Sequence, residues 1–253
     1  MRILTMLMAL MLGLLTVPGE ENSSLAKKNG YVINLDRAEK LEKMTYSSLF
    51  SKAGIIVLED TDESLLGKVD KLEVCDNNLY VLEKGRGLFL FNKQGKFIKM
   101  IGRQGKGPGE YIDPDDISID RENKKIYVLD SQTQNVLKYS GNGTFESSFK
   151  LENKGTRSTF IQPFKNALYT NLYTFDKSGK RFLLSKVDVT NGKRISFQFE
   201  ASQYNKGWNE LFSTDQHTFI SGPTGNPKFM QIFMDTIFEI TPKGIKPLSL
   251  IHI

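Results

Sequence analysis

The chain has 253 residues, which is long enough for one large domain or two small ones. Hydrophobic residues make up 39% and charged residues 25% of the chain, a composition that excludes a disordered or membrane-embedded protein. The formal net charge is +5, but acidic and basic residues are interspersed and form no basic stripe with stacking aromatic residues. Nucleic acid is therefore not an expected partner.

Residues 1–19 have the pattern of a secretory signal peptide. One basic residue, Arg2, precedes an apolar run of about fifteen residues, and Pro18 breaks that run. The run is shorter than the ~20 apolar residues that a spanning helix needs, so we expect export with no stable transmembrane span after signal removal. No cysteine lies near the end of the run, so a lipid anchor is not expected. The expected location is the periplasm or the cell envelope.

Residues 20–50 are polar and charged and are predicted to form an N-terminal extension or linker. From residue 51 onward the chain consists of short runs rich in Val, Ile, Leu, Phe and Tyr, bounded by Gly, Asn or Asp. The first run, 54–59, is predicted to be a buried strand, and 65–69 is the next candidate. No stretch after residue 45 has the periodicity of a long helix. These patterns predict one all-β domain over residues 51–253.

One segment of the chain occurs twice, about 47 residues apart: the run Asn78 to Glu83 returns as Lys125 to Asp130. A repeat of this period, built from short strands, is typical of a β-propeller blade. In the second copy Ile117 and Ile119 take the places that Leu72 and Val74 have in the first. The predicted strands are 72–74, 79–83, 88–91 and 96–101 in the first copy, and 116–120, 126–130, 135–139 and 144–149 in the second.

The repeat weakens after residue 151, but strand-like runs continue. They span 167–171, 181–187, 194–199, 217–220, 229–233 and 236–240. At about 45 residues per four-stranded blade, the β region makes four to five blades. The chain stops at Ile253 within a predicted strand. An open ring would expose an unpaired sheet edge, so we expect a C-terminal truncation relative to closed propellers.

The run Gly102 to Tyr111, followed by the strand 126–130, resembles the NHL-type repeat. It is more closely similar to the six-bladed β-propeller proteins that Bacteroides-type bacteria export, and residues 235–240 resemble a later blade of that family. The resemblance covers residues 51–253 and implies a six-bladed propeller of four-stranded blades. Many members carry a lipoprotein cysteine and usually continue further, and both features are absent here. Because the family is largely uncharacterised, the resemblance implies a fold more than a function.

The glycine-rich run 102–109 does not match a phosphate-binding loop, because Gly107 stands where Ser or Thr is required. We interpret the run as a crossover between blades, in which glycines take conformations that side chains forbid. The acidic residues that follow make a calcium site conceivable. Their spacing is not that of a known calcium loop, so a solvated turn is favoured. These residues are Glu110, Asp113, Asp115 and Asp116.

Glu83 and Asp130 end equivalent strands, where they line a channel mouth or, more often, cap turns and pack blades. Cys75 is the single cysteine, which excludes an internal disulfide framework. The chain has only two histidines, His217 and His252. It therefore has few ligands for a zinc site and few residues for histidine-based catalysis. We therefore assign no catalytic residue, no metal ligand and no cofactor.

The favoured hypothesis is a non-catalytic binding or scaffold protein of the envelope, with an unknown protein, peptide or glycan ligand at one mouth of the propeller. The candidate contacts are bulky or charged side chains on predicted loops: Arg103, Lys106, Tyr111 and Trp208. Trp208 is the best exposed aromatic candidate to stack on a sugar ring or peptide, but a role in the core or between blades is favoured for it. The alternative is a metal-dependent propeller hydrolase or lyase, lactonase-like or amidating-lyase-like. A third hypothesis is a gene remnant without independent activity.

Overall fold

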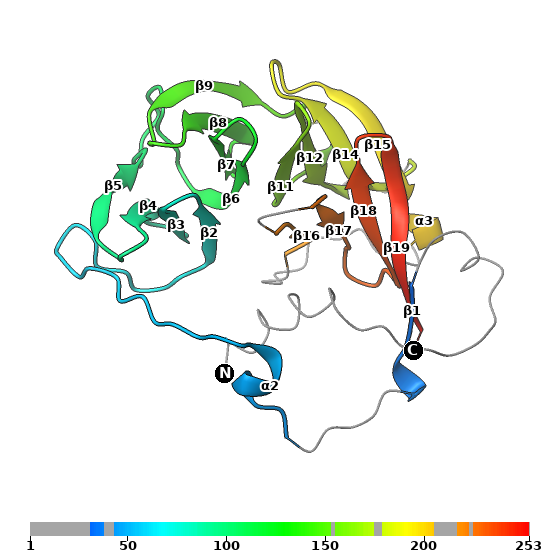
Figure 1. Ribbon diagram of the computed structural model, residues 1–253. Coiled ribbons are helices and arrows are strands. Elements are labelled where there is room, and N and C mark those ends of the chain that lie inside the picture. Colours follow the sequence, from blue (N-terminus) through cyan, green and yellow to red (C-terminus); the bar gives the residue numbers. More distant parts are fainter. Residues whose placement is uncertain are drawn as a thin grey trace.

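A computed structural model describes residues 31–37, 43–152, 155–174, 179–204, 217–222 and 225–252. The predicted signal peptide and Trp208 lie outside these residues. The described chain is all-β, and its main sheets are arranged as the four blades of a propeller, as the sequence predicts (Figure 1). The blades follow one another around an arc in chain order.

Each blade is an antiparallel sheet of four strands in chain order. Blade 1 comprises β2 (Lys71–Cys75), β3 (Asn78–Glu83), β4 (Gly87–Asn92) and β5 (Phe97–Ile101), and blade 2 comprises β6 (Pro114–Asp120), β7 (Lys125–Asp130), β8 (Asn135–Ser140) and β9 (Phe145–Lys150). Blade 3 comprises β11 (Ile161–Phe164), β12 (Ala167–Asn171), β14 (Phe182–Asp188) and β15 (Arg194–Glu200). Blade 4 comprises β16 (Phe219–Ile220), β17 (Lys228–Phe229), β18 (Thr236–Thr241) and β19 (Gly244–His252).

The remaining elements are short. β10 (Thr156–Arg157) pairs with β13 (Tyr173–Thr174), and the helical turns are η2 (Leu35–Arg37), α2 (Tyr46–Leu49) and α3 (Ala201–Tyr204). β1 (Tyr31–Asn34) lies within the predicted N-terminal extension, yet it adds to the outer edge of blade 4 by parallel pairing with β19. Part of the extension therefore belongs to the sheet structure of the propeller.

The repeated sequence corresponds to repeated strand pairing. Val81 of β3 lies opposite Leu72, and Val128 of β7 lies opposite Ile117, so the two copies have the same register. Side chains alternate between the two faces of each strand, and in these blades both faces are covered. This explains why β3 and β7 are continuous apolar runs rather than alternating ones.

The cores lie between successive blades. Between blades 1 and 2, residues of β3, β4 and β5 pack against residues of β6, β7 and β8. The second core joins blades 2 and 3, and the third joins blades 3 and 4. The first strand of each blade is the innermost, since β6 contacts both β2 and β11 near the centre of the arc (Figure 1). Side chains on β2, β6 and β11 are therefore the ones nearest the propeller channel.

Two predicted strands are wrong. Residues 54–59 form no strand and are mostly exposed, with Ile55 at 93% and Val57 at 78% exposure. Residues 65–69 also form no strand. A run of β-branched residues becomes a strand only where a second strand supplies hydrogen-bond partners, and the described structure places none beside either segment. The predicted strands at 217–220 and 229–233 are present but reduced to 219–220 and 228–229.

Candidate functional site

One face of the propeller carries the segments that link the blades, and we call it the crossover face. It is formed by the linking segments 102–113 and 151–160 and by the turns 84–86 and 131–134 within blades 1 and 2. A hydrogen bond from Gln104 Nε2 to the Gly85 carbonyl, at 2.9 Å, joins a linking segment to a turn. Loops that a rigid β scaffold positions in this way are frequent binding sites.

The glycine-rich segment forms a compact loop on this face. The Tyr111 amide donates to the Arg103 carbonyl at 3.1 Å, and the Gly105 amide donates to the Tyr111 carbonyl at 3.0 Å. Inside the loop, the Gly107 amide donates to Glu110 Oε2 at 2.8 Å. The loop is thus closed by its own backbone, in agreement with the interpretation of a structural crossover.

Tyr111 is the anchor of this loop. Its side chain is 1% exposed, whereas the sequence predicts a ligand contact on an open loop. Its hydroxyl donates to the Ile101 carbonyl at 2.9 Å and accepts from the Leu88 amide at 3.1 Å, and burial raises its pKa. Tyr111 was predicted to be a loop residue because it follows a glycine-rich run. Its aromatic ring is instead buried in the core between blades 1 and 2, where it removes a large apolar surface from water.

Arg103 and Lys106 lie on the outer surface of the loop, as predicted. The Arg103 side chain is 81% exposed, and its Nε lies 2.6 Å from Glu110 Oε1. Hydrogen bonds from the Gly107 amide and from Arg103 lower the pKa of Glu110. Of the four predicted contacts, two are therefore on the surface, one is in the core, and Trp208 lies outside the described residues.

The four acidic residues after the glycine run do not converge. Glu110 pairs with Arg103, and Asp115 Oδ1 lies 3.4 Å from Lys84 Nζ. Burial raises the pKa of Asp115, although Lys84 opposes this change. Asp116 contacts both blade 1 and blade 3, as described next. Within the ranges that the structure describes, no group of three His, Cys, Asp or Glu side chains is arranged to hold a metal ion.

Asp116 joins three blades near the channel. Its side chain is fully buried, and Oδ1 lies 2.7 Å from Nζ of Lys71 on blade 1. Oδ2 accepts a hydrogen bond of 2.8 Å from the amide of Ile161 on blade 3. A buried carboxylate needs a partner for each oxygen, and here one cation and one amide provide them. The arrangement is a structural ion pair at the centre of the arc.

A second ion pair joins blades 1 and 2. Arg121 Nη2 is 3.0 Å from Glu73 Oε2, and Lys71 Nζ is 4.0 Å from Glu73 Oε1. Burial raises the pKa of Glu73, and the two cations oppose that change. Two cations and two carboxylates therefore balance, and the inner strands present no net charge to a ligand at this position.

The second strand of blades 1, 2 and 3 ends in a polar residue. The side chain of that residue accepts hydrogen bonds from backbone amides of the segment that precedes the blade. Glu83 accepts from the Gly67 amide at 3.2 Å, and Asp130 accepts from the Ile112 amide at 2.8 Å. In blade 3 the same position is held by Asn171, which accepts from the amides of Thr159 and Phe160 at 2.9 and 2.8 Å. The capping interpretation of Glu83 and Asp130 is confirmed, and Asn171 is a third member that the weaker repeat concealed.

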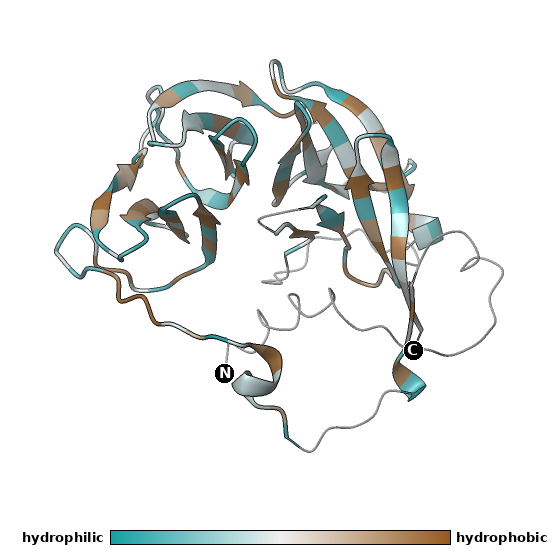
Figure 2. Cartoon of the chain, viewed as in Figure 1, coloured by the Kyte–Doolittle hydropathy of each residue, from teal (hydrophilic) through white to brown (hydrophobic). Residues whose placement is uncertain are grey.

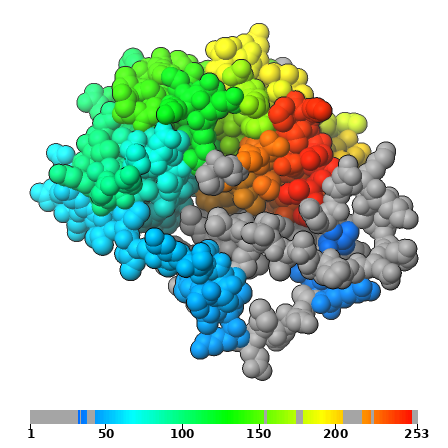
Figure 3. Space-filling view, in the orientation of Figure 1, coloured from blue at the N-terminus to red at the C-terminus, as the bar shows by residue number. Residues whose placement is uncertain are grey.

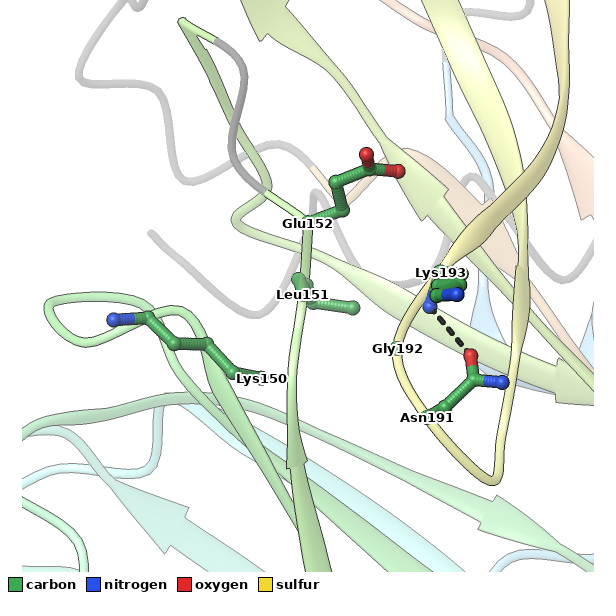
Figure 4. Close-up of a pocket in the computed structure, with 6 residues that line it drawn as sticks. All are labelled: Lys150, Leu151, Glu152, Asn191, Gly192 and Lys193. Atoms are coloured by element: carbon green, nitrogen blue, oxygen red, sulfur yellow. Dashed lines mark hydrogen bonds between the residues drawn. The ribbon is translucent and has the colours of Figure 1, made fainter.

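A shallow pocket of about 550 Å³ lies between blades 2 and 3 (Figure 4). Its wall is formed by the chain leaving β9 and by the turn between β14 and β15: Lys150, Leu151, Glu152, Asn191, Gly192 and Lys193. Figure 4 shows Lys150 and Glu152 pointing to opposite sides of their segment. The sequence did not indicate this pocket, because its two walls are about forty residues apart and each resembles an ordinary turn.

The guanidinium of Arg194, at the turn that lines this pocket, is hydrogen-bonded to other protein groups. Its Nε donates to the Glu152 carbonyl at 3.0 Å, and its terminal nitrogens donate to Thr170 Oγ1 at 3.2 Å and to Thr156 Oγ1 at 3.3 Å. Burial lowers its pKa to about 10. These contacts join β15 to the segment between blades 2 and 3, so Arg194 serves the blade interface.

Fold and site together define a β-propeller in which inner ion pairs join neighbouring blades and a compact, hydrogen-bonded loop exposes Arg103 and Lys106 on the crossover face. The chain belongs to the family described as a domain of unknown function, DUF4934, whose model matches residues 30–253. No curated protein matches the chain.

Among solved structures, a Bacteroides fragilis protein described as exported is similar, with a TM-score of 0.63 and 21% identity over 88% of this chain. A Bacteroides vulgatus member of the DUF4221 family aligns over 67% of this chain and 53% of its own, with a TM-score of 0.48 and 9% identity. A streptogramin B lyase aligns over 71% of this chain and 53% of its own, with a TM-score of 0.42 and 19% identity. The chain spans 59% of the length of the Bacteroides fragilis structure.

Proposed function

We propose that this chain is an exported, non-catalytic binding protein of the periplasm or cell envelope. Its ligand is a protein, peptide or glycan held on the crossover face. The observation that carries the proposal is the loop 102–111, which is held by backbone hydrogen bonds and by the buried Tyr111 and presents Arg103 and Lys106 to solvent. A loop ordered before binding loses little conformational entropy when a ligand arrives.

Further basic side chains lie next to this loop and support the choice of face. Lys84 and Arg86 flank Gly85, whose carbonyl accepts the hydrogen bond from Gln104. Their side chains are 40% and 41% exposed; Lys84 lies near Asp115 and Asp70, and Arg86 pairs with Glu83. Exposed cations on a folded surface favour a ligand that carries carboxylates or other anionic groups. Because attraction between exposed charges is screened by salt, binding of such a ligand should weaken as the salt concentration rises.

The export of the chain and its finer architecture belong to the same proposal. Support for export comes from the signal-like sequence of residues 1–19 and from the similar Bacteroides fragilis protein that is described as exported. Within the described ranges, no helix has the length and apolarity to cross a bilayer. We place the four blades in an NHL-like propeller of six blades that belongs to a longer chain.

The hydrolase or lyase alternative gains no specific support. That hypothesis asks for carboxylates from at least three blades converging on one point. Three of the four acids of the 110–116 segment are instead held by different partners: Glu110 by Arg103, Asp115 by Lys84 and Asp116 by Lys71. Two of these pairs fix a loop or a blade interface, which is a structural use of the charges.

The test is a binding measurement with a matched control. Polysaccharide, peptidoglycan and protein fractions from the envelope of the source bacterium are immobilised separately, and the purified chain is passed over each. The variant Arg103→Ala with Lys106→Ala is expected to bind its fraction about tenfold more weakly, a loss of roughly 1.4 kcal/mol. The control Lys93→Ala with Lys96→Ala removes two exposed lysines from the opposite face and should bind normally. Equal losses in both variants, or no binding to any fraction, would contradict the proposal.

A further inference from the structure

Blades 2 and 3 meet on the crossover face through the turn 131–134 and the linking segment 156–158. Figure 3 shows the green residues of blade 2 in contact with the yellow-green and yellow residues of blade 3, and Figure 2 shows hydrophilic residues on the loops at the ends of the blade 2 strands. We call the contact between these two segments the blade 2–3 junction.

Gln134 fixes the two segments of the junction relative to each other. Its Nε2 donates to the carbonyls of Ser131 and Ser158 at 2.8 and 2.9 Å, and its Oε1 accepts from the Ser158 amide at 2.8 Å. Gln134 itself is 4% exposed. Three buried hydrogen bonds therefore hold the junction in place before any ligand arrives.

Polar atoms without a hydrogen-bond partner are concentrated at this junction. Eight buried side-chain nitrogen and oxygen atoms of the described ranges have no partner, and three of them lie here: Thr133 Oγ1, Arg157 Nε and Ser158 Oγ. Ser158 is fully buried. Because an unpaired buried polar atom is costly, buried donors and acceptors in folded proteins nearly always have a partner. Three such atoms on two segments in contact indicate a group that binds there.

Arg157 is a cation without a carboxylate. Arg86, Arg103 and Arg121 each pair with an acidic side chain, at 3.2, 2.6 and 3.0 Å. Among the residues that the structure describes, no Asp or Glu lies within ion-pair distance of Arg157, and its guanidinium makes one hydrogen bond, from Nη2 to Ser131 Oγ at 3.3 Å. A half-buried guanidinium needs an acceptor, and carboxylates and phosphates have the matching geometry.

Asp115 is the acid that acts on Arg157 through space, but it has another partner. Its Oδ1 lies 3.4 Å from Lys84 Nζ. Burial raises the pKa of Asp115, and the charges of Lys84 and Arg157 oppose this change. Asp115 therefore adds negative potential near the junction while it leaves the hydrogen-bond donors of Arg157 free.

The free donors of the junction match one carboxylate. The Nε–H of an arginine and one N–H of Nη2 are parallel, so together they bind the two oxygens of a carboxylate. Here Nε has no acceptor, and Nη2 has only the long bond to Ser131, whose hydroxyl proton is itself free to donate. The hydroxyl of Thr133 is a further free donor. Thr133 and Arg157 are only partly buried, which leaves a small group a path to these donors.

We propose that Arg157, with the hydroxyls of Ser131 and Thr133, binds the free carboxylate of a peptide. A singly charged group is favoured over a phosphate, because Asp115 repels additional negative charge. A carboxylate at the end of a flexible chain is favoured over one on a sugar ring, because Ser131 is recessed, at 2% exposure. The junction lies on the crossover face, so this inference deepens the proposed function and rests on it for the presence of a ligand there.

The first experiment titrates the purified, ¹⁵N-labelled chain with N-acetyl-diglycine, whose only charge is its terminal carboxylate. The Nε–H resonance of Arg157, assigned by its absence from the Arg157→Lys variant, is expected to move downfield and to saturate, because Nε gains an acceptor. The matched neutral probe, N-acetyl-diglycinamide, should leave this resonance unchanged. A resonance that does not move with the acid, or that moves equally with the amide, overturns the proposal.

The second experiment compares variants by the backbone amide shifts of residues 131–134 during the same titration. Arg157→Lys should bind N-acetyl-diglycine at least about tenfold more weakly, because an ammonium keeps the charge but lacks the two parallel donors. Ser131→Ala should bind about threefold more weakly, since it removes one hydroxyl donor. The controls Arg181→Gln and Ser147→Ala change an arginine and a serine outside the junction and should bind normally. Wild-type affinity in Arg157→Lys and Ser131→Ala overturns the proposal.

Competing probes test the choice of ligand. D-Glucuronate and inorganic phosphate are titrated under the same conditions, and both are expected to bind more weakly than N-acetyl-diglycine. Tighter binding of either one overturns the assignment to a peptide carboxylate. The outcome is also separate from that of the envelope-fraction assay. A chain that binds N-acetyl-diglycine but no envelope fraction contradicts the proposed function, whereas a chain that binds a fraction but not the small acid contradicts the junction site.

Discussion

Blades 1 and 2 are two copies of one repeat, and they differ in what lies beside them. Blade 2 has a blade on each side, so Ile117 is fully buried. Blade 1 has a blade on one side only, and Leu72 at the equivalent position remains 37% exposed. The two residues have nearly the same size and hydrophobicity. The difference shows that burial in a propeller is decided by the neighbouring blade.

The two copies also differ where they meet. Lys71 in blade 1 and Asp116 in blade 2 occupy equivalent positions, opposite Leu82 and Leu129. These equivalent positions carry opposite charges, and the two side chains pair with each other across the interface. An exact repeat would have placed like charges in succession around the channel. The sequence difference between the two copies at this position therefore creates an ion pair between blades 1 and 2.

The largest expected effect is at this ion pair. Asp116→Ala leaves Lys71 and the Ile161 amide without their acceptor, and the free energy of unfolding should fall by about 3–5 kcal/mol. The control Glu122→Ala breaks the pair with Lys165, whose side chains are 64% and 50% exposed, and should cost at most about 1 kcal/mol. Urea unfolding monitored by fluorescence measures both. A loss below about 1 kcal/mol for Asp116→Ala would show that the pair contributes no more than a surface pair.

The direct test of the blade comparison is the pair Ile117→Ala and Leu72→Ala. Removing the buried Ile117 side chain should cost about 2–5 kcal/mol, since it leaves a cavity between blades. Leu72→Ala should cost less than about 1 kcal/mol, because solvent already reaches this side chain. The two values come from the same denaturant titrations. Similar losses in both variants would mean that another part of the chain covers Leu72 in solution.

Two buried tyrosines allow a finer comparison. Tyr111→Phe removes the acceptor of the Leu88 amide and the donor to the Ile101 carbonyl, both in the core, and should cost about 1–3 kcal/mol. Tyr80→Phe removes the donor to the Gly141 carbonyl at 2.8 Å and the acceptor of a longer bond from Asn78 Nδ2 at 3.3 Å. Both bonds are only partly buried, so the change should cost about 0.5–1.5 kcal/mol. Thermal unfolding of both variants at one pH measures the order. A larger loss of stability for Tyr80→Phe than for Tyr111→Phe would mean that Tyr111 is not the main anchor of the crossover loop.

The smallest expected effect concerns pH. The folded-state pKa of Glu110 is lowered by the hydrogen bond from the Gly107 amide and by Arg103, so the carboxylate stabilises the loop above the ordinary value of 4.5. That contribution is lost as the pH falls through the lowered pKa. The amide resonance of Gly107 should therefore titrate with a midpoint below 4.5, and Glu110→Gln should show no such titration. A midpoint at or above 4.5 would mean that the hydrogen bond is absent in solution.

Most of blades 1 and 2 could be predicted from the sequence because they repeat it. Short apolar runs between turn residues, recurring about every 47 residues, define both the strands and their order. Blade 3 was less clear, and the strand Ile161–Phe164 was missed because it is short and contains Pro163. The capping role of Asn171 was missed for a related reason, since an amide replaces the acids of the first two blades.

The candidate site was predicted only in part. Arg103 and Lys106 were placed on a surface loop because charged residues among glycines rarely have another place to go. Tyr111 was misplaced because the sequence does not show that the loop folds back on blade 1. The separation of Asp115 from Asp116 was equally hidden. Neighbouring residues on a strand point to opposite faces of the sheet. The partners of Asp115 and Asp116 lie on blades 1 and 3, so they are known only from the arrangement of the blades.

The sequence by itself determined the all-β class, the period of the repeat and the location of most strands, because these depend on hydrophobic pattern and turn residues within a short window. Only the tertiary structure decided which faces are covered, which charges meet and what residues 54–59 do. That segment has the composition of a buried strand and is exposed in the structure. A strand is defined by its partners, and its partners are distant in sequence, so local composition cannot specify whether they are present.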